Sequence, residues 1–144
     1  MNKIGGDCLK KNFILGFFLC LIVLASIQLS KSTLIENALT EEFFSSDTIL
    51  RIEEINKTNF TATNTSLEKQ QEMKELLKGQ KLSILEKSFD PLKAEYRIVS
   101  TSNPNDQIYI FVDENVIVFP HKSSRGYKIK NNHELIREVD FLLK

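Results

Sequence analysis

The feature that most constrains this chain is an uncharged apolar segment near its amino terminus. Residues 13–29 read FILGFFLCLIVLASIQL, which is 17 residues without a single charge. As a helix that rises ~1.5 Å per residue, this segment would be ~26 Å long, close to the ~30 Å hydrocarbon core of a bilayer. A soluble domain of about 100 residues could hardly bury a helix that is apolar on every side. We therefore predict a transmembrane signal-anchor helix over residues 13–30.

The charges around this segment predict its orientation. Lys10 and Lys11 lie directly before it, and positive charge beside a membrane helix favours the cytoplasmic side. We expect residues 1–12 to form a cytoplasmic lead, with a single pass through the cell membrane and an extracytoplasmic carboxyl terminus. The alternative is cleavage after the small residue Ala25, which would give a secreted protein. We favour the uncleaved anchor because the apolar run continues past Ala25.

The rest of the chain is nearly neutral and contains no cysteine. The whole chain has 19 basic and 19 acidic residues, and its first 29 residues hold three lysines and one aspartate. This leaves 16 basic and 18 acidic residues for the remainder, without the broad positive field that binds a nucleic-acid backbone. We therefore expect no nucleic-acid partner. Cys8 and Cys20 both precede the domain, so disulfides and thiolate zinc sites are excluded from its fold.

Hydrophobic spacing after the apolar segment predicts a stalk followed by one domain. Apolar residues recur at helical spacing from Leu34 to Leu39, which predicts a helical stalk over residues 31–47. The domain is then expected to span residues 48–144. Its strands are predicted over residues 48–55, a short segment within 57–65, and residues 81–86, 94–100, 107–112, 116–119 and 126–130.

Two helices are predicted within this domain. Thr65 opens a capping box before a helix over residues 66–78, and Gly79 follows where a left-handed residue is expected. The second helix follows Asn131 or Asn132, either of which can cap it. Since most strand connections are short, we predict an α+β fold: a small antiparallel sheet with helices packed on one face. The buried stripe of the second helix is expected to comprise Leu135, Ile136, Val139, Leu142 and Leu143.

The sequence contains no recognisable catalytic, metal-binding or nucleotide-binding motif. His121 lies near two serines, but no nearby residues suggest the orienting acid and oxyanion hole that a nucleophilic serine requires. Neither His121 nor His133 has further ligands at metal-binding spacing. Glu53 and Glu54 should point to opposite faces of one strand, so they cannot act together on one bond. We expect no enzyme activity, no cofactor and no metal site.

These observations favour a membrane-tethered extracytoplasmic binding or accessory domain. We expect it to contact the lipid bilayer through residues 13–30, and an envelope protein or an anionic envelope polymer through the folded domain. Two alternatives stay open: a secreted inhibitor or immunity-type protein after signal cleavage, and a structural subunit of an envelope complex. The candidate partner-binding residues are His121, Lys122, Arg125, Tyr96 and Tyr109.

Overall fold

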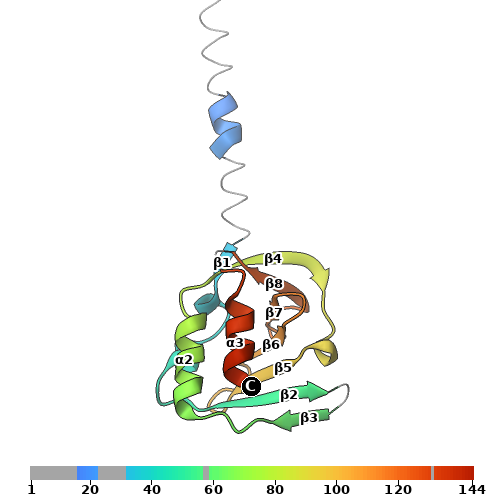
Figure 1. Ribbon diagram of the computed structural model, residues 1–144. Coiled ribbons are helices and arrows are strands. Elements are labelled where there is room, and N and C mark those ends of the chain that lie inside the picture. Colours follow the sequence, from blue (N-terminus) through green and yellow to red (C-terminus); the bar gives the residue numbers. More distant parts are fainter. Residues whose placement is uncertain (1–15, 23–31, 57–58, 131) are drawn as a thin grey trace, which may run out of the picture. The chain divides into compact units, whose positions relative to one another are not determined.

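The computed structural model describes two compact units separately (Figure 1). In the first unit, Met1–Ser32, residues 16–22 form a helix with exposed side chains. Most of the predicted transmembrane segment, residues 13–30, lies outside the described residues. No helix in the described part of the chain is both long and apolar enough to cross a membrane. The residues described are 16–22, 32–56, 59–130 and 132–144.

The second unit, Thr33–Lys144, is an α+β domain built on one antiparallel sheet. Its eight strands follow the order β1-β4-β8-β7-β6-β5-β2-β3 across the sheet. β5 to β8 form a meander, which the β2–β3 hairpin extends on one side and β4 extends on the other. The strands are β1 (Ser32–Leu34), β2 (Leu50–Asn56), β3 (Asn59–Ala62), β4 (Lys81–Ser88), β5 (Tyr96–Ser100), β6 (Gln107–Phe111), β7 (Val116–Val118) and β8 (Arg125–Ile129).

Both helices of this unit lie side by side on one face of the sheet, as the sequence predicts (Figure 1). α2 (Leu67–Leu77) crosses from β3 at one edge towards β4 near the other edge, and α3 (Leu135–Leu143) follows β8. The connections also contain three short 3-10 helices. They are η1 (Ile35–Asn37), η2 (Glu41–Phe44) and η3 (Pro91–Lys93).

The main core lies between the helices and the sheet. Because side chains alternate along a strand, every second residue of β5 and β6 points towards the helices. A second, smaller cluster lies on the opposite face of the sheet, and it leaves no room for a side chain at Gly126. A Cβ there would lie 2.5 Å from a ring carbon of Phe89. This cluster comprises Ile55, Phe89, Ala94, Phe111, Val116 and Val118.

The segment that precedes β2 differs from the predicted stalk. Over residues 32–47 the chain forms β1, η1 and η2 instead of one continuous helix. Ile35, Leu39 and Phe43 are buried in the main core. The helical prediction for residues 31–47 is therefore wrong from residue 32 onward. The apolar spacing that suggested a stalk belongs to residues that pack into the domain.

Buried polar contacts tie α2 to the rest of the domain. The Leu50 amide donates a hydrogen bond to Gln70 Oε1 at 2.9 Å, and Gln70 Nε2 donates to the Thr65 carbonyl at 3.1 Å. Lys74, also buried, donates to two backbone carbonyls of the segment before β2. Since buried polar groups are costly unless paired, these contacts fix the position of α2 beside β2.

The predicted cap of α2 is displaced by one residue. Ser66, not Thr65, is the N-cap, and its hydroxyl accepts a hydrogen bond from the Lys69 amide at 3.3 Å. The Thr65 hydroxyl instead bonds the Thr63 hydroxyl at 3.0 Å. After the helix, Gly79 has a φ of 76°, which confirms the predicted left-handed residue.

The terminal helix, α3, follows the predicted pattern closely. Four residues of its predicted stripe are buried, whereas Leu142 is only partly buried. Its N-cap residue is Glu134, which makes no capping hydrogen bond through its side chain. Asn132 instead accepts a hydrogen bond from the Glu134 amide at 3.1 Å, and Asn131 lies outside the described residues. The predicted asparagine N-cap is therefore replaced by an asparagine turn before the helix.

Candidate functional site

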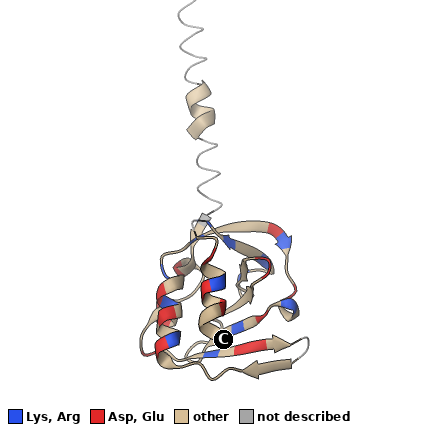
Figure 2. Ribbon diagram, viewed as in Figure 1, with Lys and Arg blue, Asp and Glu red and all other residues tan. Residues whose placement is uncertain are grey.

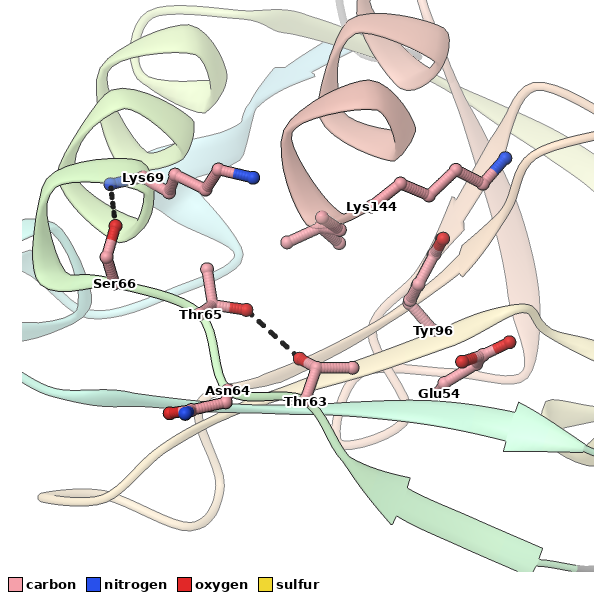
Figure 3. Close-up of a pocket in the computed structure, with 9 residues that line it drawn as sticks. Glu54, Thr63, Asn64, Thr65, Ser66, Lys69, Tyr96 and Lys144 are labelled. Atoms are coloured by element: carbon pink, nitrogen blue, oxygen red, sulfur yellow. Dashed lines mark hydrogen bonds between the residues drawn. The ribbon is translucent and has the colours of Figure 1, made fainter.

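A polar pocket of about 520 Å³ lies at the end of the helix pair where α2 begins and α3 ends (Figure 3). Its walls come from β2, β5, the β3–α2 connection, the first turn of α2 and the last residues of α3. The antiparallel arrangement of the two helices brings these segments together. Most of the lining side chains carry hydroxyl, amide, ammonium or carboxylate groups.

One wall of the pocket is a fixed hydrogen-bonded group. The Tyr96 hydroxyl donates to Asp140 Oδ1 at 2.7 Å, and Lys144 Nζ donates to Asp140 Oδ2 at 2.7 Å. Burial raises the pKa of the Tyr96 phenol far above its usual range, and the Asp140 carboxylate raises it further. The same carboxylate also raises the pKa of Lys144. At neutral pH Tyr96 is therefore a protonated donor that is held in place by Asp140.

Two exposed charges of opposite sign complete the pocket. Lys69 extends from the first turn of α2 on one side, and Glu54 lies beside Tyr96 on the other (Figure 3). Within the described residues, neither the Lys69 ammonium nor the Glu54 carboxylate has an ion-pair partner. The hydroxyls of Thr63 and Thr65 lie between the two charges (Figure 3). The pocket therefore presents both signs of charge together with neutral hydrogen-bonding groups.

The raised pKa of Tyr96 predicts a specific effect of alkaline pH on stability. Above the usual phenol pKa of about 10, the unfolded chain loses this proton while the folded protein keeps it, so stability falls as pH rises. Tyr96→Phe removes this contribution. Urea unfolding between pH ~9 and ~11 should give a steeper loss of unfolding free energy for the wild type than for Tyr96→Phe. Parallel pH profiles would contradict a raised Tyr96 pKa.

The two tyrosines proposed from sequence point to opposite faces of the sheet. Tyr96 of β5 pairs with Ile110 of β6, whereas Tyr109 pairs with Arg97. Tyr96 therefore points towards the helices and lines the pocket, while Tyr109 packs beside the smaller cluster on the other face. Tyr96 and Tyr109 therefore belong to different surfaces, because their positions along the paired strands β5 and β6 differ by one residue.

The basic residues proposed from sequence lie together, but not at the pocket. His121 and Lys122 are exposed in the connection between β7 and β8, and Arg125 is the exposed first residue of β8. Lys122 Nζ donates to the backbone carbonyl of Asn37, the last residue of η1, and this bond links the β7–β8 connection to η1. In the view of Figure 2, charges of both signs are interspersed on the helices and strands of the domain.

Alternation along β2 is confirmed by its two adjacent glutamates. Glu53 is nearly buried on the helix-free face, where Arg51 and Arg97 contact its carboxylate at 2.9 and 3.1 Å. Glu54 takes the other face and lines the pocket. Sequence reasoning placed Glu54 on a separate face but did not connect it with Lys69. These residues come from different elements, and only the tertiary fold brings them together.

A second hollow of about 610 Å³ lies along the outer sides of α2 and α3. Its apolar part is formed by Leu76, Phe141 and Leu142, and Phe141 is 81% exposed. Glu72 and Glu138 border these residues. This surface differs from the polar pocket because its centre is apolar and its charged border is mainly acidic.

The polar pocket is chemically suited to hold a small polar molecule. Asp140 holds Tyr96 in place in the pocket wall, the polar side chains of the lining can form hydrogen bonds, and Lys69 and Glu54 can contact charged groups of a ligand. Such convergent polar groups in a concave surface are typical of ligand sites. No protein-family model matches the chain, and neither curated proteins nor solved structures provide a significant match.

Proposed function

We propose that this protein is a membrane-tethered extracytoplasmic domain that binds a small polar ligand in the pocket between the start of α2 and the end of α3. The observation that carries the binding proposal is the pair of oppositely charged side chains, Lys69 and Glu54, that face this pocket without ion-pair partners among the described residues. The pocket volume of about 520 Å³ falls within the range of small-molecule sites, ~300–1,000 Å³.

The uncharged segment over residues 13–29 supports the membrane tether. Lys10 and Lys11 precede it and favour a cytoplasmic amino terminus. The compact domain begins at Thr33, only a few residues after this segment. A secreted binding protein is the alternative if the chain is cleaved after Ala25.

A reporter that is active only in the cytoplasm tests the proposed topology. Fused after Lys144, it should give no signal, because the carboxyl terminus is proposed to be extracytoplasmic. The same reporter fused after Asn12 should be active and serves as the control. A strong signal from the Lys144 fusion would mean an inverted or cytoplasmic protein. Sequencing the amino terminus of the membrane-extracted chain tests cleavage, and a start at Ser26 would contradict the anchor.

Binding itself is tested by screening small polar compounds against the full chain in lipid nanodiscs. Amide resonances of the protein, observed by NMR, should shift most for Thr65, Ser66 and Leu143, which line the pocket. A compound that shifts only amides around Phe141 would place binding in the other hollow. If charged, zwitterionic and neutral polar compounds all leave the pocket amides unchanged, the proposed function is wrong.

A structural subunit of an envelope complex is the second candidate function, and the exposed Phe141 favours it. A large apolar side chain that is 81% exposed beside Leu76 and Leu142 offers an anchor for a partner helix, and Glu72 and Glu138 suit a partner with basic flanks. This candidate predicts that the full chain, extracted in mild detergent, elutes as a larger complex at low salt. Phe141→Ser should elute as the free protein, with an unchanged melting temperature.

A further inference from the structure

We propose that the pocket recognises a zwitterion, specifically a short peptide with a free amino group and a free carboxylate. The carboxylate would contact Lys69, and the ammonium group would contact Glu54. This inference rests on the proposed binding function and adds the chemical class of the ligand.

The two ends of the pocket differ in charge. Asp140 does not contribute a free charge, because Lys144 pairs with it at 2.7 Å. Glu54 makes no ion pair within 4 Å among the described residues and supplies a negative charge on the side of β2 and β5, although its field reaches Lys144 and contributes to the raised pKa of that lysine. A smaller adjoining hollow of about 260 Å³ shares Glu54 and adds the carboxylates of Glu95 and Asp113. Lys69 provides the positive charge on the side of α2 (Figure 3).

This charge separation discriminates between classes of ligand. A ligand that fills the pocket removes water from Lys69 and Glu54, and a desolvated charge is costly unless a partner replaces the water. A simple anion would pair with Lys69 but would be repelled by Glu54. A simple cation would pair with Glu54 but would be repelled by Lys69. A neutral sugar would leave both charges without a partner. A molecule with both charges, separated by a polar chain, compensates the two residues at once.

The size of the pocket fits a short peptide. A sphere of about 520 Å³ is about 10 Å across, and an extended tripeptide, at ~3.3–3.6 Å per residue, has nearly the same length. Peptide amides and carbonyls also need hydrogen-bond partners when they leave water. The hydroxyls of Thr63 and Thr65 lie between the two charged ends (Figure 3), and Asn64 also lines the pocket. The Thr63 hydroxyl donates to the Ile52 carbonyl and therefore accepts from the Thr65 hydroxyl, so the two threonine oxygens can accept hydrogen bonds from peptide amides. The side-chain amide of Asn64 can both donate and accept.

Three tripeptides with different end groups test the proposal on the full chain in lipid nanodiscs. The probes are tri-alanine, N-acetyl-tri-alanine and tri-alanine amide, and the dissociation constant of each is measured from amide chemical shifts. Tri-alanine should bind in the pocket, and blocking either end should weaken binding about tenfold, because each block removes one charge-assisted contact. If both blocked peptides bind as tightly as tri-alanine, or if tri-alanine does not shift the pocket resonances, the zwitterion proposal is wrong.

Variants assign each end of the ligand to one residue. Lys69→Met should weaken tri-alanine binding and abolish the preference over tri-alanine amide, while keeping the preference over the N-acetyl peptide. Glu54→Gln should also weaken tri-alanine binding, but it should abolish the preference over the N-acetyl peptide and keep the preference over tri-alanine amide. Both side chains are exposed, so unchanged melting temperatures are expected for the two variants. Lys128→Met, an exposed position on β8 outside the pocket, is the matched control and should bind all three peptides like the wild type.

Two outcomes separate this inference from the proposed function. If other polar compounds bind the pocket in the nanodisc screen while tri-alanine does not, the binding function stands and the zwitterion proposal is overturned. If Lys69→Met and Glu54→Gln lose the same preferences, the two ends of the ligand are not recognised separately, which also overturns it. If Lys69→Met loses only the preference over tri-alanine amide and Glu54→Gln loses only the preference over the N-acetyl peptide, both the site and the orientation of the ligand are supported.

Discussion

Replacing Leu135 with alanine should lower the free energy of unfolding by about 2–5 kcal/mol, because it removes buried methyl groups and leaves a cavity. Leu135 is fully buried in the main core at the first turn of α3. A small domain has only about 5–15 kcal/mol of stability in total, so this change is a large fraction of it. Thermal melting should show a decrease of about 4–8 °C for each kcal/mol lost.

Exposed positions on the same helix provide the controls for this measurement. Phe141→Ser should leave the melting temperature nearly unchanged, because Phe141 is 81% exposed. Arg137→Ala breaks an exposed ion pair with Glu134 at 3.2 Å, and such pairs contribute little. Leu142→Ala should have a smaller effect than Leu135→Ala, because Leu142 is only partly buried. If Leu135→Ala melts like Phe141→Ser, α3 does not contribute to the core.

The parts of this fold that sequence predicts well are those governed by local spacing. Alternation predicted that Glu53 and Glu54 of β2 take opposite faces of the sheet, and the 3.6-residue period of α3 predicted its buried stripe. Gly79 was predicted as a left-handed residue for a similarly local reason, since it directly follows a helix. In each case the deciding contacts lie within a few residues of one another.

Long-range contacts explain why the segment before β2 was predicted incorrectly. The Ile35 amide donates to the carbonyl of Gln80 at 3.1 Å, and Thr40 hydrogen-bonds to the buried Asp106, which is 66 residues away. Helical spacing cannot reveal such partners, and burial of Phe43 in the core favours short 3-10 turns over a free helix. Here tertiary contacts outweigh local helix propensity.

The same limit applies to the polar pocket. Tyr96 is among the candidate partner-binding residues proposed from sequence, but its partner Asp140 lies 44 residues further along the chain. No pattern within one element shows that β2, the start of α2 and the end of α3 share a pocket. The sequence carried one usable signal, since the four-residue spacing of Asp140 and Lys144 allows an ion pair on one helix face.

Lys74 is a buried lysine whose removal should have the second large effect on stability. Only 2% of the residue is exposed, and its ammonium donates to the carbonyls of Ser45 at 2.6 Å and Thr48 at 2.5 Å. These carbonyls belong to the chain segment between η2 and β2. Among the hydrogen bonds of the described residues, those from Lys74 join this segment to α2, whereas Gln70 joins α2 to Leu50 of β2. Lys74 therefore holds this segment against the helix.

Lys74→Met should lower the unfolding free energy by about 1–3 kcal/mol, because the buried Thr48 carbonyl is left without a donor, whereas the Ser45 carbonyl keeps its hydrogen bond from the Thr48 amide. Relief of the desolvated ammonium offsets part of this loss. Methionine keeps most of the packing of the lysine stem, so the change reports mainly on the lost hydrogen bonds. Lys78→Met, one turn further along at an exposed position, is the matched control and should change stability little. Urea unfolding at neutral pH measures both variants. Equal stability of Lys74→Met and wild type would contradict this role.

The difference in unfolding free energy between wild type and Lys74→Met should depend on pH, and this dependence reports on the environment of the Lys74 ammonium. Burial lowers the pKa of Lys74 from its usual value of 10.5, although the nearby Asp47 carboxylate opposes this effect. Between the lowered folded-state pKa and 10.5, the unfolded chain binds more protons than the folded protein. The pH-dependent part of the Lys74 contribution to stability therefore increases as pH rises through this range and is lost as pH falls through the folded-state pKa. Tyr96 acts in the opposite direction at alkaline pH, but it is present in both proteins and cancels. The stability gap between wild type and Lys74→Met should therefore widen as pH rises towards 10.5. A gap that narrows would mean that the two carbonyls and Asp47 favour the charged ammonium more than burial disfavours it.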